Sequence, residues 1–262
     1  METIPLFLSL TRREIIGRYR GSVLGIFWSL LNPLFMLAVY TFVFGTVMKS
    51  RWTVPGQQEA QHSTGEFAVI LFCGLIVFQF FAEVVSSAPG LIVANANYVK
   101  KIVFPIHILP MVSAGAALFH AAVGLVVLLG FALGVFGHIP LTVILAPVVF
   151  APFIVLVAGI AWILASAGVY FRDMSQIVVP LVTATLFLSP VFFQRTSLPG
   201  WLQPWLSLNP LAIPVESFRN VVIFGVQPDW GSFGYYWVAA IAIAFVGYQF
   251  FQKTRRGFAD VL

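Results

Sequence analysis

Charged residues are scarce in this chain of 262 residues, of which Asp, Glu, Lys and Arg together make up only 9%. Soluble domains carry about 25% charged residues, so this composition excludes a soluble globular protein. Disorder is excluded too, because 60% of the residues are hydrophobic and 16% are aromatic, the opposite of the polar composition that keeps chains unfolded. The composition therefore predicts a polytopic membrane protein, with residues 1–262 in a single domain.

Motifs that carry enzymatic chemistry are also absent from the sequence. A single cysteine, Cys73, excludes an intramolecular disulfide and zinc sites built on several cysteines. The four histidines lack the spacing of a metalloprotease, and no G-x-S-x-G motif is present. Because the phosphate-binding loop G-x-x-x-x-G-K-[ST] is missing, any ATP-driven work would need another chain. We expect no catalytic residue, metal or cofactor in this chain.

Long apolar runs are what the sequence does contain. A membrane-spanning helix needs about 20 mainly apolar residues, and six runs qualify. The expected spans are about 24–48, 67–91, 108–136, 141–169, 176–194 and 233–251. The predicted fold is therefore all-α, with six transmembrane helices.

The distribution of basic residues predicts the orientation of these spans. An even number of spans places both termini on one side, and Lys and Arg concentrate in cytoplasmic segments. With both termini in the cytoplasm, the inner segments hold ten Lys and Arg residues and the outer segments hold four. We therefore attribute the net charge of +5 to membrane orientation and not to nucleic-acid binding.

The cytoplasmic N-terminal segment, residues 1–22, is expected to contain an interfacial helix over 4–20. Four residues from Ile4 to Tyr19 fall on one apolar stripe, which suits a helix lying on the inner leaflet with its cations toward lipid phosphates. Glu14 and Arg18 have the spacing of a helical ion pair. The candidate functional residues of this helix are Arg12, Arg13, Arg18, Tyr19 and Arg20.

Glu83 is the only acidic residue inside an expected span. An ionisable residue at such depth is a functional candidate by default, facing a pore or a partner. A helix–helix hydrogen bond or a position near the cytoplasmic end would equally reduce its cost. A proton relay is not expected, because no second ionisable residue is foreseen in the neighbouring spans.

Two short polar segments face the cytoplasm in this topology. The segment 93–101 is cationic and could press into a cleft of a cytoplasmic partner, while Arg172 and Asp173 could form a charged latch at the inner mouth. Adjacent charges do not face each other on a helix, so each would need its own partner. The candidate residues in the first segment are Asn95, Asn97, Tyr98, Lys100 and Lys101.

The segment 195–232 is too long for a turn and too apolar for a simple loop. Its stretch 211–224 is apolar over only 14 residues and carries Glu216 and Arg219, which suits a re-entrant or interfacial helix better than a span. An ordinary outer cap with tryptophans at the membrane interface is the alternative.

Several motifs together resemble the polysaccharide-export permeases of the ABC-2 type, the membrane subunits of O-antigen, teichoic acid and capsule exporters. The resemblance covers essentially the whole chain. The motifs are REIIGRYRGSVLGIFW at 13–28 with NPL at 32–34, NYVKKIVFP at 97–105, FRD at 171–173, NPL at 209–211 with VESFR at 215–219, and FAD at 258–260.

The resemblance implies an assembly and a direction of transport. Two copies of this permease would join two copies of a separate P-loop ATPase, which would bind ATP and Mg, in the bacterial inner membrane. The complex would export a lipid-linked polysaccharide, with O-antigen as the first choice, from cytoplasm to periplasm. Segment 93–101 would dock on the ATPase, and re-entrant helices within 199–225 would gate the outer mouth. The residues implied for this gate are Asn209, Pro210, Glu216 and Arg219.

Channels of this family are similar in having aromatic belts, on which sugar rings can slide. Most phenylalanines in a membrane helix simply face lipid or neighbouring helices, which is the alternative for each candidate. The candidates are Phe35, Tyr40, Phe42, Phe187, Phe192 and Phe193.

Two other functions stay open at this point. An integral membrane enzyme acting on a lipid-linked sugar would need a cluster of polar catalytic residues at one membrane face. An ABC-2 permease for small drugs or lipids would share the same plan of spans.

Overall fold

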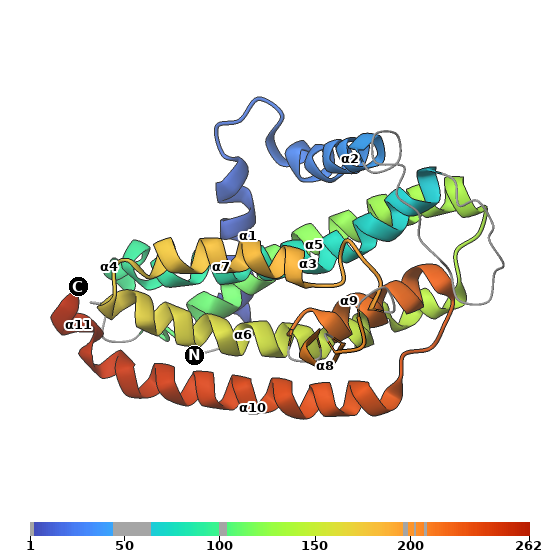
Figure 1. Ribbon diagram of the computed structural model, residues 1–262. Coiled ribbons are helices and arrows are strands. Elements are labelled where there is room, and N and C mark those ends of the chain that lie inside the picture. Colours follow the sequence, from blue (N-terminus) through green and yellow to red (C-terminus); the bar gives the residue numbers. More distant parts are fainter. Residues whose placement is uncertain (1–2, 44–63, 100–103, 196–198, 202, 207–208) are drawn as a thin grey trace.

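The computed structural model describes residues 3–43, 64–99, 104–195, 199–201, 203–206 and 209–262, and all regular structure in these ranges is helical (Figure 1). Eight helices of at least eight residues make up most of it. They are α1 (Thr3–Tyr19), α2 (Trp28–Tyr40), α3 (Thr64–Ala94), α5 (Ile108–Phe136), α6 (Ala146–Tyr170), α7 (Met174–Leu188) and α10 (Trp230–Thr254), together with the shorter α9 (Ala212–Arg219). Short turns of helix complete the fold: η1 (Gly25–Phe27), α4 (Ala96–Val99), η3 (Leu141–Leu145), α8 (Gln203–Leu206), η5 (Asn220–Phe224), η6 (Arg255–Gly257) and α11 (Phe258–Val261).

Five helices in the described ranges are long and apolar enough to cross a membrane, which confirms the predicted all-α polytopic class. They are Gly25–Val43, Gly65–Ala94, Ile108–Phe136, Leu141–Tyr170 and Trp230–Val261. The remaining part of the first expected span, to residue 48, lies outside the described residues.

The fifth expected span, 176–194, is represented by the 15-residue α7, which ends at Leu188. Its predicted C-terminal boundary is wrong by six residues. Ser189 adopts an extended conformation with φ −105° and ψ 157°. This conformation is the one favoured before a proline, and Pro190 also lacks the backbone N–H needed to continue the helix.

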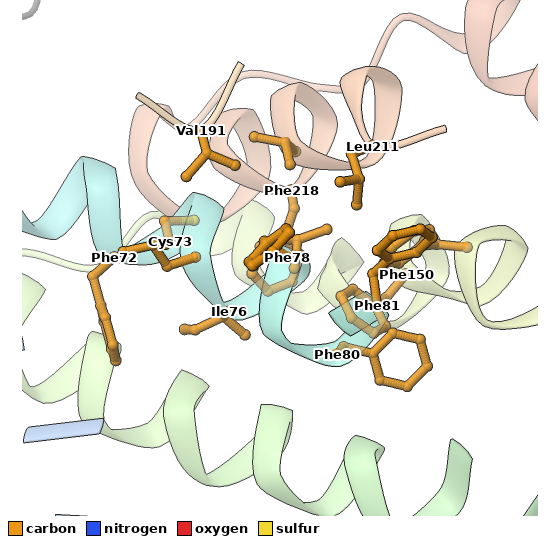
Figure 2. Packing of buried hydrophobic residues seen from close by; sticks show 14 of the residues in the cluster. Phe72, Cys73, Ile76, Phe78, Phe80, Phe81, Phe150, Val191, Leu211 and Phe218 are labelled. Carbon is orange, nitrogen blue, oxygen red and sulfur yellow. The ribbon is translucent and has the colours of Figure 1, made fainter. Parts of the chain in front are cut away.

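α3 forms the centre of the bundle and contacts α5, α6, α7 and α9. Figure 2 shows side chains from α3 packing against Phe150 of α6 and Phe218 of α9. The Phe80 and Phe150 rings lie 5.2 Å apart, and Phe150 and Phe218 lie 5.4 Å apart. These edge-on and tilted contacts fix α9 against the two long helices.

α6 and α10 run side by side along the bundle (Figure 1) and pack with their backbones in close contact. A methyl group added at Gly159 would lie 2.7 Å from the backbone of Ala244, and one added at Gly247 would collide with the Gly159 carbonyl. Small residues permit such close approach of membrane helices, whose association depends on van der Waals contact.

The C-terminal ends of α6 and α10 are joined by the last residues of the chain. The Tyr170 hydroxyl donates a hydrogen bond to the Thr254 carbonyl at 2.8 Å. Phe258, in the FAD motif, is fully buried against Tyr170 and Phe251. At the other end, Asp229 caps the start of α10 by accepting hydrogen bonds from Ser232 and Gly231, and these bonds lower the pKa of its carboxyl.

α1 crosses the bundle at a steep angle (Figure 1) and packs on α5. Leu10 is buried against Ile108 and Val112. Ile4 and Leu8 are 72% and 59% exposed, so the first half of the apolar stripe expected to face lipid is free of the bundle, whereas Tyr19 at its other end contacts His120 of α5. A second apolar face, which the stripe analysis missed, holds the helix on the protein.

Because α6 and α10 are in close contact, two glycines of α10 should differ in their tolerance of an added methyl group. Gly247→Ala should lower the free energy of unfolding by about 1 to 3 kcal/mol, because the added methyl group has no space. Gly234, in the same helix, has no atom near its added methyl group, so Gly234→Ala should be neutral or stabilising by up to about 1 kcal/mol. Thermal unfolding of the detergent-solubilised proteins measures both, and equal effects would contradict this packing.

Candidate functional site

A polar cluster joins α1, α3 and α5 inside the apolar bundle. Arg18 Nη1 donates a hydrogen bond to Glu83 Oε1 at 2.6 Å, and His120 Nδ1 lies 3.0 Å from both carboxylate oxygens. The Tyr19 hydroxyl lies 3.0 Å from His120 Nε2. The His120 ring therefore contacts three polar partners, because Arg18 Nη1 also lies 3.0 Å from His120 Nδ1. Burial raises the pKa of the Tyr19 hydroxyl, so it stays available as a donor.

Two predictions about this region are wrong. Among the described residues, Arg18 pairs with Glu83 and not with Glu14, the partner that the helical spacing predicted. A second ionisable side chain, His120 of α5, does lie beside Glu83. The sequence carried a usable signal: Glu83 lies 11 residues before the end of α3 at Ala94, and His120 lies 12 residues after the start of α5 at Ile108. In antiparallel neighbours this places both side chains at the same depth.

Beside this cluster lies a cavity of about 430 Å³ between α1, α2, α3 and α5. Its walls combine charged, amide, hydroxyl and aromatic groups. The lining residues are Arg18, Tyr19, Ser22, Trp28, Ser29, Asn32, Pro33, Gln79, Glu83 and His120.

Tyr98, in the segment expected to dock on the ATPase, contacts the N-terminal helix α1. Arg13 Nη1 donates to the Tyr98 hydroxyl at 2.6 Å, and its guanidinium carbon lies 5.7 Å from the centre of the same ring. The Tyr98 ring also stacks on the Phe104 ring, with 4.4 Å between the ring centres. The structure thus brings together α1 and the segment around Tyr98, which the sequence analysis considered separately.

The other residues of this segment are placed as follows. Asn95 donates to the Leu91 carbonyl at 2.9 Å and so belongs to the end of α3, whereas Asn97 is exposed. Lys100 and Lys101 lie outside the described residues. Of the cations on α1, Arg12 and Arg20 are exposed.

The inner-mouth turn Arg172 and Asp173 is exposed directly before α7. The Asp173 backbone carbonyl accepts a hydrogen bond from the Gln176 N–H at 2.9 Å. Neither side chain bonds to another residue of the described ranges, so the latch stays a prediction.

At the end of the bundle opposite to Tyr98, Arg219 is 3% exposed and holds three chain segments together. Its guanidinium donates to the carbonyls of Ile70, Pro190 and Val191 at 3.2, 3.0 and 3.1 Å. Gly74 makes room for it, because an added methyl group there would lie 2.6 Å from Arg219 Nη2. These bonds tie α9 to α3 and to the chain leaving α7.

The NPL turn before α9 reaches two further helices. Asn209 donates to the Leu188 carbonyl at the end of α7 at 3.0 Å, and the Pro210 carbonyl accepts from the Tyr236 hydroxyl of α10 at 2.9 Å. Glu216, on α9, is half-buried. The structure therefore brings Asn209, Pro210 and Arg219 together beside the end of α7, and the gate itself stays a prediction.

The aromatic candidates divide into two groups. Phe35, Phe42 and Phe187 are 68%, 62% and 65% exposed. The other three, Tyr40, Phe192 and Phe193, are half-buried, and Phe192 stacks on Phe187 at 5.8 Å. All six lie on α2, on α7 or shortly after them; the three exposed rings face away from the bundle, whereas Tyr40 and Phe192 pack against its core.

A family model described as "ABC-2 type transporter" matches residues 5–223 of this sequence. The chain belongs to the ABC-2 type transporter family. The match runs from α1 through η5 and so includes the polar cluster and the Arg219 contacts. Membership agrees with the membrane-spanning helices, and the chain is a multi-pass membrane transporter subunit of this family.

Similar ABC-2 proteins align with the chain over almost its whole length. The O-antigen export system permease protein RfbA of Klebsiella pneumoniae is 26% identical over 98% of this chain and 95% of its own. RfbA of Myxococcus xanthus is 28% identical over 97% and 94%. The polysialic acid transport protein KpsM of Escherichia coli is 28% identical over 92% and 90%.

The role of Arg219 can be tested by stability. Arg219→Met should lower the free energy of unfolding by about 2 kcal/mol or more, because it leaves three carbonyls without this donor and each unsatisfied buried group costs about 1–3 kcal/mol. Arg256→Met removes an exposed guanidinium and is the matched control. Unfolding temperatures in detergent measure the difference; an unchanged value for Arg219→Met would show that these contacts are dispensable.

Proposed function

We propose that this chain is the permease subunit of an ATP-binding-cassette exporter that moves a lipid-linked polysaccharide, with O-antigen as the first choice, from cytoplasm to periplasm. The observation that carries the proposal is the nearly full-length similarity to two kinds of polysaccharide transporter, the RfbA and KpsM proteins. Family membership disfavours a membrane enzyme, and these relatives disfavour a permease for small drugs or lipids.

In this proposal a separate P-loop ATPase binds ATP and Mg and docks on segment 93–101. Two contacts support a route for the resulting movement. Tyr98 joins the segment to Arg13 of α1, and Arg18 of the same helix joins Glu83 and His120 of the bundle. Closure of the ATPase would therefore act on α1, α3 and α5 together.

The proposed complex contains two copies of this chain, with α2 and α7 at their interface. The exposed apolar residues on these helices support this arrangement, including Phe35 of α2 and Leu181 of α7. A polysaccharide would pass between the copies, along the aromatic residues of the two helices. Membrane lipids would cover the remaining outer faces.

The proposed location is the bacterial inner membrane, with both termini in the cytoplasm. Contacts at one end of the bundle support termini on the same side. Ile4 and Phe7 line a common cavity with His107 and with Tyr248, near the end of α10. Residues 93–99 and the C-terminal helix α11 lie at this end as well (Figure 1).

The transport function predicts a phenotype for the docking segment. Replacing Tyr98 and Lys101 together with alanine should reduce surface polysaccharide at least tenfold while leaving the amount of chain in the membrane unchanged. Tyr98→Phe keeps the ring stacked on Phe104 but loses the bond from Arg13, so it should cause a smaller loss. Lys253→Ala, an exposed cation at the inner end of α10, is the control.

The measurement is polysaccharide at the surface of cells whose own copy of the gene is deleted and replaced by each variant. Co-purification of the chain should also recover a P-loop ATPase. Normal polysaccharide export in the deletion strain would contradict the proposed function. Normal export by the double variant would contradict only the assignment of residues 93–101.

The proposed interface predicts a cross-link between two copies. Cysteine introduced at Ile177, Leu181 or Leu188, which are 57%, 59% and 66% exposed on α7, should give a disulfide-linked dimer when membranes are oxidised. Val238→Cys, 70% exposed on α10, should give none. The native Cys73 is fully buried and does not interfere. If only Val238→Cys gave a disulfide-linked dimer, the interface would lie on α10, which would contradict the proposed interface on α2 and α7.

A further inference from the structure

The cavity between α1, α2, α3 and α5 is lined by two polar stripes that face each other. Gln79 and Glu83 are four residues apart on α3, and Trp28 and Asn32 are four residues apart on α2. Residues at this spacing lie on the same side of a helix. Two successive turns of each helix thus present polar or aromatic groups to one space.

Gln79 is the single exposed residue between Phe67 and Phe81, a stretch of α3 that is otherwise buried. Asn32 is exposed on α2, among apolar residues that are exposed as well. Neither amide forms a hydrogen bond with another residue in the part of the chain that the structure describes. A polar group in an apolar surrounding is costly unless it meets water, a ligand or a protein partner. These two amides therefore indicate a cavity that takes a polar occupant.

The charges at the cavity decide between an anion and a neutral ligand. Arg18 is the cation that could attract a phosphate, but its guanidinium already pairs with the Glu83 carboxylate at 2.6 Å. That carboxylate also faces the cavity and would repel an anion. Hydroxyl groups both donate and accept hydrogen bonds, so they suit a mixture of carboxylate, amide and imidazole groups.

Trp28 adds an aromatic face to this mixture. It is 41% exposed, at the start of α2, and lines the same cavity. The C–H groups on one face of a pyranose ring form an apolar surface that packs on such a ring, while the hydroxyl groups at its edge remain free to bond. The volume, about 430 Å³, lies within the range of about 300–1,000 Å³ of small-molecule sites.

The cavity is also placed where it could meet a substrate from the cytoplasm. Glu83 lies 11 residues from the inner end of α3, which corresponds to about 16 Å at 1.5 Å per residue. This is about half the thickness of the hydrocarbon core, which measures about 30 Å. This depth places the site near the middle of the membrane, in the half of the 31-residue α3 that ends at Ala94.

We propose that this cavity is a sugar-binding site, in which a pyranose ring of the transported polysaccharide stacks on Trp28 and hydrogen-bonds to Asn32, Gln79 and Glu83. The identity of the sugar as part of the cargo rests on the proposed function, whereas the sugar chemistry rests on the residues of the cavity. Arg18 and His120 hold the Glu83 carboxylate in position for this contact.

The test is direct binding to the full-length chain in lipid nanodiscs, because the headgroups of common maltoside detergents are themselves sugars. The probe is the oligosaccharide released by mild acid from the surface polysaccharide of the same cells, detected by saturation-transfer NMR. We expect Trp28→Leu and Gln79→Leu each to weaken binding at least fivefold. Trp28→Phe, which keeps an aromatic face, should weaken it less than threefold. Trp230→Leu, at an exposed tryptophan of α10, should bind as the native chain does.

Inorganic pyrophosphate, the second probe, should neither bind nor displace the oligosaccharide. Absence of oligosaccharide binding, equal binding by Trp28→Leu and the native chain, or displacement by pyrophosphate would each overturn the sugar site. The proposed function fails separately, if cells lacking the chain still export their polysaccharide. Loss of export on deletion together with unaltered binding by both leucine variants would reject the site and leave the exporter function standing.

Discussion

α3 is enclosed by other helices over most of its length, so the polar groups that it exposes inside the bundle need partners within the protein. The partners of these polar groups differ along the helix. Near the outer end, the Ile70 carbonyl accepts a hydrogen bond from the buried Arg219. Further in, Glu83 is paired with Arg18 and His120, and Gln79 opens onto a cavity. The contacts that position α1, α5 and α9 thus follow from the central place of α3.

The two sides of the bundle are held by different forces. α6 and α10 approach until the backbones of Gly159 and Gly247 touch, which leaves little freedom for either helix to slide. α2 and α7 instead expose large apolar side chains and contact the bundle over short stretches. Relative movement of helices is easier where interfaces are small and loosely packed. The structure therefore combines a rigid pair with two helices suited to rearrangement against lipid or a second copy.

Hydropathy alone predicted the spans well, because membrane helices are selected by length and composition. The range 108–136 coincides with α5, and 141–169 differs from the helical stretch Leu141–Tyr170 by one residue. The end of α7 was misplaced because the apolar run continues through Pro190, where the backbone cannot remain helical. Composition does not report that local steric limit.

The contacts of the candidate sites were harder to predict from sequence than the spans. The spacing of Glu14 and Arg18 suggested a local pair, but the half-buried Glu83 carboxylate, 65 residues away, pairs with the guanidinium instead. An exposed local pair is worth little, whereas Glu83 in an apolar bundle must be neutralised. The motif residues Tyr98 and Arg219 were identified, yet their partners come from distant segments that only the folded chain brings together.

The sequence separation of the Arg219 contact also bears on how the chain enters the membrane during synthesis. Arg18 precedes Glu83, so a cation is already available when α3 leaves the ribosome. Arg219 follows Ile70 by 149 residues, and its binding position against α3 can be filled only after most of the chain has been made. The chain can therefore form these contacts with α3 in two steps. Glu83 can pair with Arg18 early, whereas the Ile70 carbonyl receives its donor only after α9 has been made.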